Sequence, residues 1–133
     1  MTQADAAATG SAGAPAGSFS DDELLALPTV FRADLFAGRT VLVSGAGTGI
    51  GKATACLFGR LGARLVLCGR SEEKLAATAQ LLARIGAPNV VQPTNIREPE
   101  QVDALFARIE AEGFAPDVLI NNAGGQYPQP SID

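Results

Sequence analysis

Short apolar runs alternate along this chain with longer segments of helical periodicity. The apolar runs are Thr40–Ser44, Arg64–Cys68, Asn89–Gln92 and Asp117–Asn121. Continuous apolar runs of this length are typical of strands that are covered on both faces, and their alternation with helices is typical of right-handed strand–helix–strand units. The chain is therefore predicted to be an α/β domain with a parallel sheet of about four strands in the spatial order 3-2-1-4.

Three crossover helices are expected, over residues 50–61, 71–85 and 99–112. In the last two, apolar residues recur at helical spacing and predict the face that covers the sheet. These residues are Leu75, Ala79, Leu82 and Ile85 in one helix and Val102, Leu105, Phe106 and Ile109 in the other.

The N-terminal segment has a different composition. Residues 1–20 are almost entirely small or polar, so we expect a disordered tail, because such a segment buries too little surface to offset the entropy of ordering. Residues 21–35 are predicted to hold a short helix, favoured by the acidic Asp21–Glu23 and interrupted by Pro28, and a linker. The folded domain is expected to cover residues 36–133, starting near Phe36.

Composition excludes several functions. The 10 basic residues are scattered among 14 acidic ones, which argues against nucleic acid as a partner, and no apolar run is long enough to cross a membrane. The chain has no histidine, and its two cysteines, Cys56 and Cys68, lie in apolar stretches, so we expect no metal site and two reduced core thiols. These features lead us to expect a cytoplasmic protein.

The segment Ser44–Gly51 reads Ser-Gly-Ala-Gly-Thr-Gly-Ile-Gly and lies between the first strand and its helix. Glycine at Gly45, Gly49 and Gly51 lets the backbone approach a ligand closely, and the amides of a helix N-terminus point at a bound pyrophosphate. The alternative is an ordinary glycine-rich turn, but its place after a strand and before a helix favours phosphate binding. The fold prediction thereby becomes a Rossmann-type doubly wound sheet.

Two motifs in order resemble the short-chain dehydrogenase/reductase family. The first is the Ser-Gly-x-x-x-Gly-Ile-Gly pattern, and the second is Asn-Asn-Ala-Gly at the end of the fourth strand. The resemblance spans roughly residues 35–127 and implies a nicotinamide dinucleotide cofactor. The residues that it assigns to the cofactor in these motifs are Gly45, Thr48, Gly49, Ile50, Gly51, Asn121, Asn122, Ala123 and Gly124. Asn121 and Asn122 have an alternative role, which is to brace the sheet where its strand order reverses.

Cofactor choice is expected to depend on the end of the second strand. A carboxylate there would bind the 2′-hydroxyl of NAD, but this chain has Gly69, Arg70 and Ser71. A guanidinium and a hydroxyl suit a 2′-phosphate, so NADP(H) is favoured over NAD(H), although Arg70 on a solvated strand end is the alternative. By resemblance, Asn95 and Ile96 after the third strand contact the adenine; turn chemistry alone would also place an Asn there.

The catalytic residues of the family are not found in this chain. The resemblance implies a tyrosine followed four residues later by a lysine, with an upstream serine. Tyr127 has Ser131 at that spacing, and both lysines, Lys52 and Lys74, precede it. We therefore assign no catalytic residue and expect a fragment or truncated product that is inactive alone, with its fourth strand as an open edge and with oligomers formed only by the complete protein.

The motifs are most similar to those of peroxisomal-type trans-2-enoyl-CoA reductases and bacterial citronellol dehydrogenases. Gly125 and Gln126 would follow the cofactor motif near the substrate, or form a flexible loop. The resemblance implies hydride transfer to or from an enoyl-CoA or a carbonyl or alcohol carbon of a small-molecule substrate. The alternative is a non-catalytic fragment that binds nucleotide or a partner, or an inert product.

Overall fold

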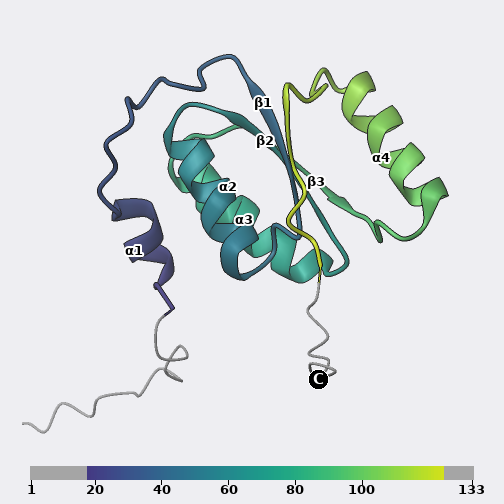
Figure 1. Ribbon diagram of the computed structural model, residues 1–133, viewed down its shortest axis with the longest axis horizontal. Helices are drawn as coiled ribbons and strands as arrows, with labels where there is room; N and C mark the ends of the chain where they lie inside the picture. The colour runs from purple at the N-terminus through teal and green to yellow at the C-terminus, as the bar shows by residue number, and fades with distance from the viewer. Residues whose placement is uncertain (1–17, 125–133) are drawn as a thin grey trace, which may run out of the picture.

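Four parallel strands form the sheet of this structure, a computed structural model that describes residues 18–124 (Figure 1). The strand order β3-β2-β1-β4 confirms the predicted doubly wound topology. The elements are α1 (Asp21–Ala26), β1 (Thr40–Ser44), α2 (Gly49–Arg60), β2 (Arg64–Gly69), α3 (Glu72–Arg84), β3 (Asn89–Pro93), α4 (Pro99–Ala111) and β4 (Val118–Ile120). The expectations for most of the tail, for Gly125 and Gln126 and for Tyr127 lie outside the described residues.

Helices cover both faces of the sheet (Figure 1). Val41 and Val43 of β1 and Leu65 and Leu67 of β2 face α2 and α3. The alternate residues of the same strands face α4, which contributes Leu105 and Ile109. Because side chains alternate across a strand, a strand that is buried on both faces must be apolar throughout, as the runs in β1 and β2 are.

The prediction for the last helix is only partly correct. Leu105 and Ile109 are buried, but Phe106 is 41% exposed. Residues four apart on a helix share a stripe, whereas the next residue is rotated by about 100° away from it. Leu105 and Ile109 therefore set the contact line, and Phe106 points away from the sheet. Beyond this helix β4 lies at the sheet edge, as expected, with Leu119 half exposed.

The short helix α1 is attached to the domain. Asp21 forms an ion pair with Lys52 of α2, and Asp22 forms one with Arg84 of α3. Arg60 donates hydrogen bonds to the carbonyls of Leu24 and Leu27, and Leu24 is buried. Ser20, which the sequence placed in the tail, caps α1 by accepting a hydrogen bond from the Glu23 amide while Glu23 accepts one from the Ser20 amide.

Both cysteines are free thiols in the interior, as expected. Cys56 lies in α2 and Cys68 in β2, and burial raises the pKa of the Cys68 thiol to about 11. In the range 18–124, no helix combines the length and the apolar character that crossing a bilayer requires.

Candidate dinucleotide-binding site

The glycine-rich turn joins the carboxyl end of β1 to the start of α2. Gly45 and Gly49 have φ angles of +68° and +54°, in the left-handed region that favours glycine. A Cβ on Gly51 would lie 2.1 Å from the Gly45 carbonyl oxygen, so this position admits no side chain. The glycine spacing is therefore a requirement of the close contact between the turn and the first turn of α2.

The first turn of α2 is open to an anion. Thr48 is the N-cap residue, yet its side chain makes no capping hydrogen bond in the described part of the chain. Thr48, Gly49 and Ile50 are all exposed. The first amides of a helix have no intrahelical acceptor, and the helix dipole adds positive potential at this end. A pyrophosphate at this point would supply the acceptors that the turn lacks.

Ser44 and Asn122 connect the ends of β1 and β4. The Ser44 hydroxyl oxygen accepts hydrogen bonds from the amides of Asn122 and Ala123, at 3.0 and 2.9 Å. The Asn122 side-chain amide donates to the carbonyls of Ser44 and Gly45, at 3.0 and 3.3 Å. Asn122 therefore has the bracing role that the sequence left open, and its contact with a cofactor stays a prediction. The hydroxyl of Ser44 was not among the predicted site residues.

The turn is also held from the side of β2 and α3. The amides of Gly45 and Ala46 donate to the Cys68 carbonyl, at 2.8 and 3.3 Å. The buried Thr78 hydroxyl of α3 donates to the Ala46 carbonyl at 2.9 Å. Sequence reasoning missed Thr78, although a threonine on the buried face of a helix is a signal, because its hydroxyl needs an internal partner.

Arg70 and Ser71 follow β2 directly beside this turn. A Cβ on Gly69 would lie 3.8 Å from the Gly45 Cα, so the end of β2 adjoins the turn. Arg70 is exposed, and its side chain has no hydrogen bond or ion pair within residues 18–124. Ser71 is the N-cap of α3, because its hydroxyl oxygen accepts from the Lys74 amide. The same hydroxyl keeps its proton as a donor, so capping and phosphate binding are compatible.

Asn95 and Ile96 lie past the end of β3, which is next to the end of β2 because the Thr94 amide donates to the Gly69 carbonyl at 2.8 Å. The Asn95 side-chain oxygen accepts from the Arg97 amide at 3.2 Å, so the turn role is present. The Asn95 side-chain nitrogen has no partner among the described residues, and Ile96 is 49% exposed. Both groups are free for the predicted adenine contact.

All the predicted cofactor residues lie at the carboxyl edge of the sheet. They follow β1 (Gly45, Thr48, Gly49, Ile50, Gly51), β2 (Arg70, Ser71), β3 (Asn95, Ile96) and β4 (Asn121, Asn122, Ala123, Gly124). The strand order reverses between β1 and β4, since β1 lies between β2 and β4. In open α/β sheets this reversal point forms the crevice that binds ligands.

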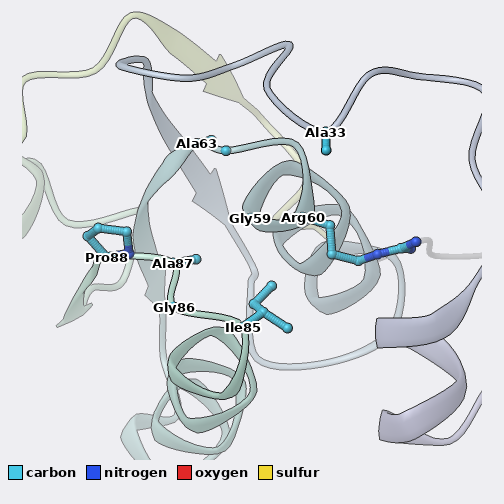
Figure 2. A pocket seen from close by; sticks show the side chains of 9 residues that line it. Ala33, Gly59, Arg60, Ala63, Ile85, Gly86, Ala87 and Pro88 are labelled. Atoms are coloured by element: carbon cyan, nitrogen blue, oxygen red, sulfur yellow. The ribbon is translucent and has the colours of Figure 1, made fainter.

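A hollow lies at the opposite edge of the sheet from the glycine-rich turn (Figure 2). This cavity of about 430 Å³ is lined by residues such as Ala63 and Ala87, which precede β2 and β3. Among its lining residues Arg60 alone is charged, and its guanidinium is already bound to carbonyls of the α1 segment. The cavity therefore offers few groups for recognition, and the turn after β1 is the better candidate site.

The structure is a doubly wound α/β domain with a glycine-rich turn at the point where the strand order reverses. The family model described as short chain dehydrogenase matches residues 39–133. The chain thus belongs to the short-chain dehydrogenase family of oxidoreductases, which confirms the resemblance in its motifs.

Curated relatives agree with this family. A glucose 1-dehydrogenase of Gluconobacter oxydans is 44% identical over 75% of this chain and 38% of its own length. A probable 2,4-dienoyl-CoA reductase of Caenorhabditis elegans is 40% identical over 74% of this chain and 32% of its own length. The chain therefore spans about a third of the length of these relatives.

Solved structures share the fold. A citronellol catabolism dehydrogenase of Pseudomonas aeruginosa PAO1 superposes with a TM-score of 0.70 at 43% identity, over 74% of this chain and 41% of that one. The L-sorbose reductase of Gluconobacter frateurii, complexed with NADPH and L-sorbose, has a TM-score of 0.67 at 29% identity, over 73% of this chain and 38% of that one.

Proposed function

We propose that this chain forms the adenosine and pyrophosphate part of an NADP(H) site in a short-chain oxidoreductase. The observation that carries the proposal is the end of β2. Arg70 is exposed there, has no hydrogen bond or ion pair within residues 18–124, and follows Gly69, which adjoins the glycine-rich turn. Between the end of β2 and Glu72 the chain has no carboxylate. NAD-binding sites have an acidic residue at this position, which would repel a 2′-phosphate. The sorbose reductase bound to NADPH supports this cofactor.

Each part of the site has a distinct task in this proposal. The first amides of α2 bind the pyrophosphate, because they lack internal acceptors. Arg70 forms a charge-assisted pair with the 2′-phosphate, and the Ser71 hydroxyl donates to the same group. Asn95 and Ile96 contact the adenine. Asn122 and Ser44 hold the turn in place, so that the amides do not reorganise when the cofactor binds.

The bound nicotinamide supplies the hydride chemistry, and the complete protein is proposed to act on an enoyl-CoA or on a carbonyl or alcohol carbon. The dienoyl-CoA reductase and citronellol dehydrogenase relatives support these two classes. An assay of the complete protein with both classes, at saturating NADPH or NADP⁺, decides between them. For the 133-residue chain alone we expect cofactor binding without turnover, because it holds no Tyr-x-x-x-Lys pair.

The first test is a calorimetric titration of the chain with NADPH and NADH. We expect the chain to bind NADPH at least about tenfold more tightly than NADH, since one well-placed charge pair is worth roughly 1.4 kcal/mol or more. Arg70→Ala should remove this preference. Arg32→Ala is the matched control, because Arg32 is an exposed arginine in the segment before β1, ion-paired with Asp34, and should leave both affinities unchanged.

Two results would overturn the proposal. One is equal affinity for NADPH and NADH in the parent chain, which would remove the role of Arg70. The other is no binding of either nucleotide by a chain that shows cooperative thermal unfolding in circular dichroism, because a folded site that does not bind contradicts the assignment of the turn.

A further inference from the structure

The lysine and arginine side chains divide into two groups. All of them lie within residues 18–124, and most contact a carboxylate, a backbone carbonyl or an aromatic ring. Arg70, Lys74 and Arg97 have no such partner in that range. All three follow the carboxyl ends of β2 and β3, on the edge of the sheet that carries the glycine-rich turn.

Lys74 is in direct contact with the glycine-rich turn. A Cβ built on Gly47 would lie 2.9 Å from the Lys74 Cβ and 3.4 Å from its carbonyl carbon. The first turn of α3 therefore occupies the space that a side chain at Gly47 would take. The Ser71 hydroxyl accepts a hydrogen bond from the Lys74 amide, and the Thr78 hydroxyl donates its proton to the Ala46 carbonyl at 2.9 Å, with the Lys74 carbonyl also within reach at 3.3 Å. The base of the Lys74 side chain is thus held against the turn, while its ammonium group is exposed.

Arg70 and Lys74 both lie close to the glycine-rich turn in the fold. Arg70 follows Gly69, whose position adjoins Gly45, and Lys74 covers Gly47. Carboxylates of the same turn of α3, Glu72 and Glu73, are exposed and form no ion pair with either cation in the described structure. Two cations that stay unpaired beside local carboxylates leave their charge available to an incoming anion.

We propose that Lys74 is a second specificity-determining cation for the adenosine 2′-phosphate of NADP(H), acting together with Arg70. This proposal rests on the proposed function of the site. Glycine at Gly47 lets the Lys74 stem lie across the turn, and the flexible stem carries a point charge toward the phosphate while Arg70 binds it with a planar fork. Lys74 lies in the first turn of α3, and its contact with Gly47 places the start of its side chain beside the glycine-rich turn.

The test compares three substitutions in the 133-residue chain. Lys74→Gln removes the charge and keeps most of the stem that packs on Gly47, Lys74→Arg keeps the charge, and Arg97→Gln removes the third unpaired cation of the same edge. Each variant is titrated with NADPH, NADH, adenosine 2′,5′-bisphosphate and 5′-AMP. Thermal unfolding checks that each variant is folded.

We expect Lys74→Gln to weaken the binding of NADPH and of adenosine 2′,5′-bisphosphate by about tenfold, which is the size of one charge-assisted contact. The affinities for NADH and 5′-AMP should be unchanged. Lys74→Arg should keep most of the affinity for NADPH, and Arg97→Gln should have little effect on it. An equal loss for NADPH and NADH would show a structural role and overturn the inference. An equal loss of NADPH affinity in Lys74→Gln and Arg97→Gln would show that any positive charge at this edge contributes to binding, which also overturns the inference.

The proposed function and this inference fail in different ways. If Lys74→Gln leaves NADPH binding unchanged while Arg70→Ala weakens it, the inference is wrong and the NADP(H) site remains. If the folded parent chain binds none of the four probes, both are wrong.

Discussion

Gly51→Ala should destabilise the domain because the added methyl group meets backbone. Its Cβ would lie 2.1 Å from the Gly45 carbonyl oxygen and 2.5 Å from the Asn122 side-chain nitrogen. Overpacking against a rigid neighbour costs roughly 1–3 kcal/mol, and displacing the Asn122 amide costs about 1 kcal/mol more. Replacing glycine within a helix returns about 1 kcal/mol. The net loss of unfolding free energy is therefore about 1–3 kcal/mol.

The matched control is Gly59→Ala, in the same helix and also buried. Its Cβ would meet the Leu82 Cδ2 at 2.7 Å and the Ala87 Cβ at 3.2 Å. The flexible end of the leucine can rotate away, and the contact with Ala87 requires a shift of only a few tenths of an ångström. The helical gain then offsets most of the cost, and we expect a change of less than about 1 kcal/mol.

Thermal unfolding followed by circular dichroism distinguishes the two variants. About 1 kcal/mol moves the transition of a domain of this size by roughly 4–8 °C, so Gly51→Ala should lower the transition temperature by about 4–24 °C, and Gly59→Ala should lower it by only a few degrees. Gly51→Ala should also lose NADPH affinity, since the turn must shift. If the two variants melt at the same temperature, the turn can move away from the start of α2 at little cost, which contradicts the close contact at Gly51.

Two further predictions concern the ends of β1. Ser44→Ala leaves the Ala123 amide without its hydroxyl acceptor, whereas the Asn122 amide keeps the Ile120 carbonyl at 3.0 Å. It should lower the unfolding free energy by about 1–3 kcal/mol in urea titration; a loss below about 0.5 kcal/mol, typical of an ordinary surface substitution, would contradict this. At the other end, the Thr40 amide and then Arg39 hold the pKa of the Asp117 carboxyl below its ordinary value of 3.8. A lowered folded pKa adds stability above the unfolded pKa and loses it as the pH falls through the folded pKa. Asp117→Asn should therefore lose less stability than the parent between pH 5 and pH 2, and parallel acid-unfolding curves would refute the role of this carboxyl.

Local patterns were sufficient to predict the sheet. The buried strands β1 and β2 are continuous apolar runs, and the handedness rule then leaves few ways to order four strands. The predicted cofactor residues also meet at one edge, because carboxyl ends of parallel strands share an edge whatever the side chains do. Phe106 was predicted wrongly, since helical periodicity does not show how wide a stripe the sheet covers.

Contacts between distant segments were beyond sequence reasoning. Ser44 and Asn122 hold the turn by hydrogen bonds although they are 78 positions apart. No local pattern in the sequence pairs a serine at the end of one strand with an asparagine after another. The docking of α1 was missed for the same reason, because it depends on Asp21 and Asp22 meeting Lys52 and Arg84 of two later helices. Such partners become visible only when the topology has brought the elements together.

Three groups within residues 18–124 hold the glycine-rich turn in place. The Cys68 carbonyl holds its amides from β2, Asn122 holds its carbonyl side from β4, and Thr78 holds it from α3. A turn fixed on three sides is organised before the cofactor arrives, so little ordering cost opposes binding. Cofactor recognition can therefore be measured in these 133 residues, and the substrate class can be tested separately on the complete protein. A failure of the first measurement in folded chain would reflect the site itself, because none of its proposed ligands lies outside residues 44–124.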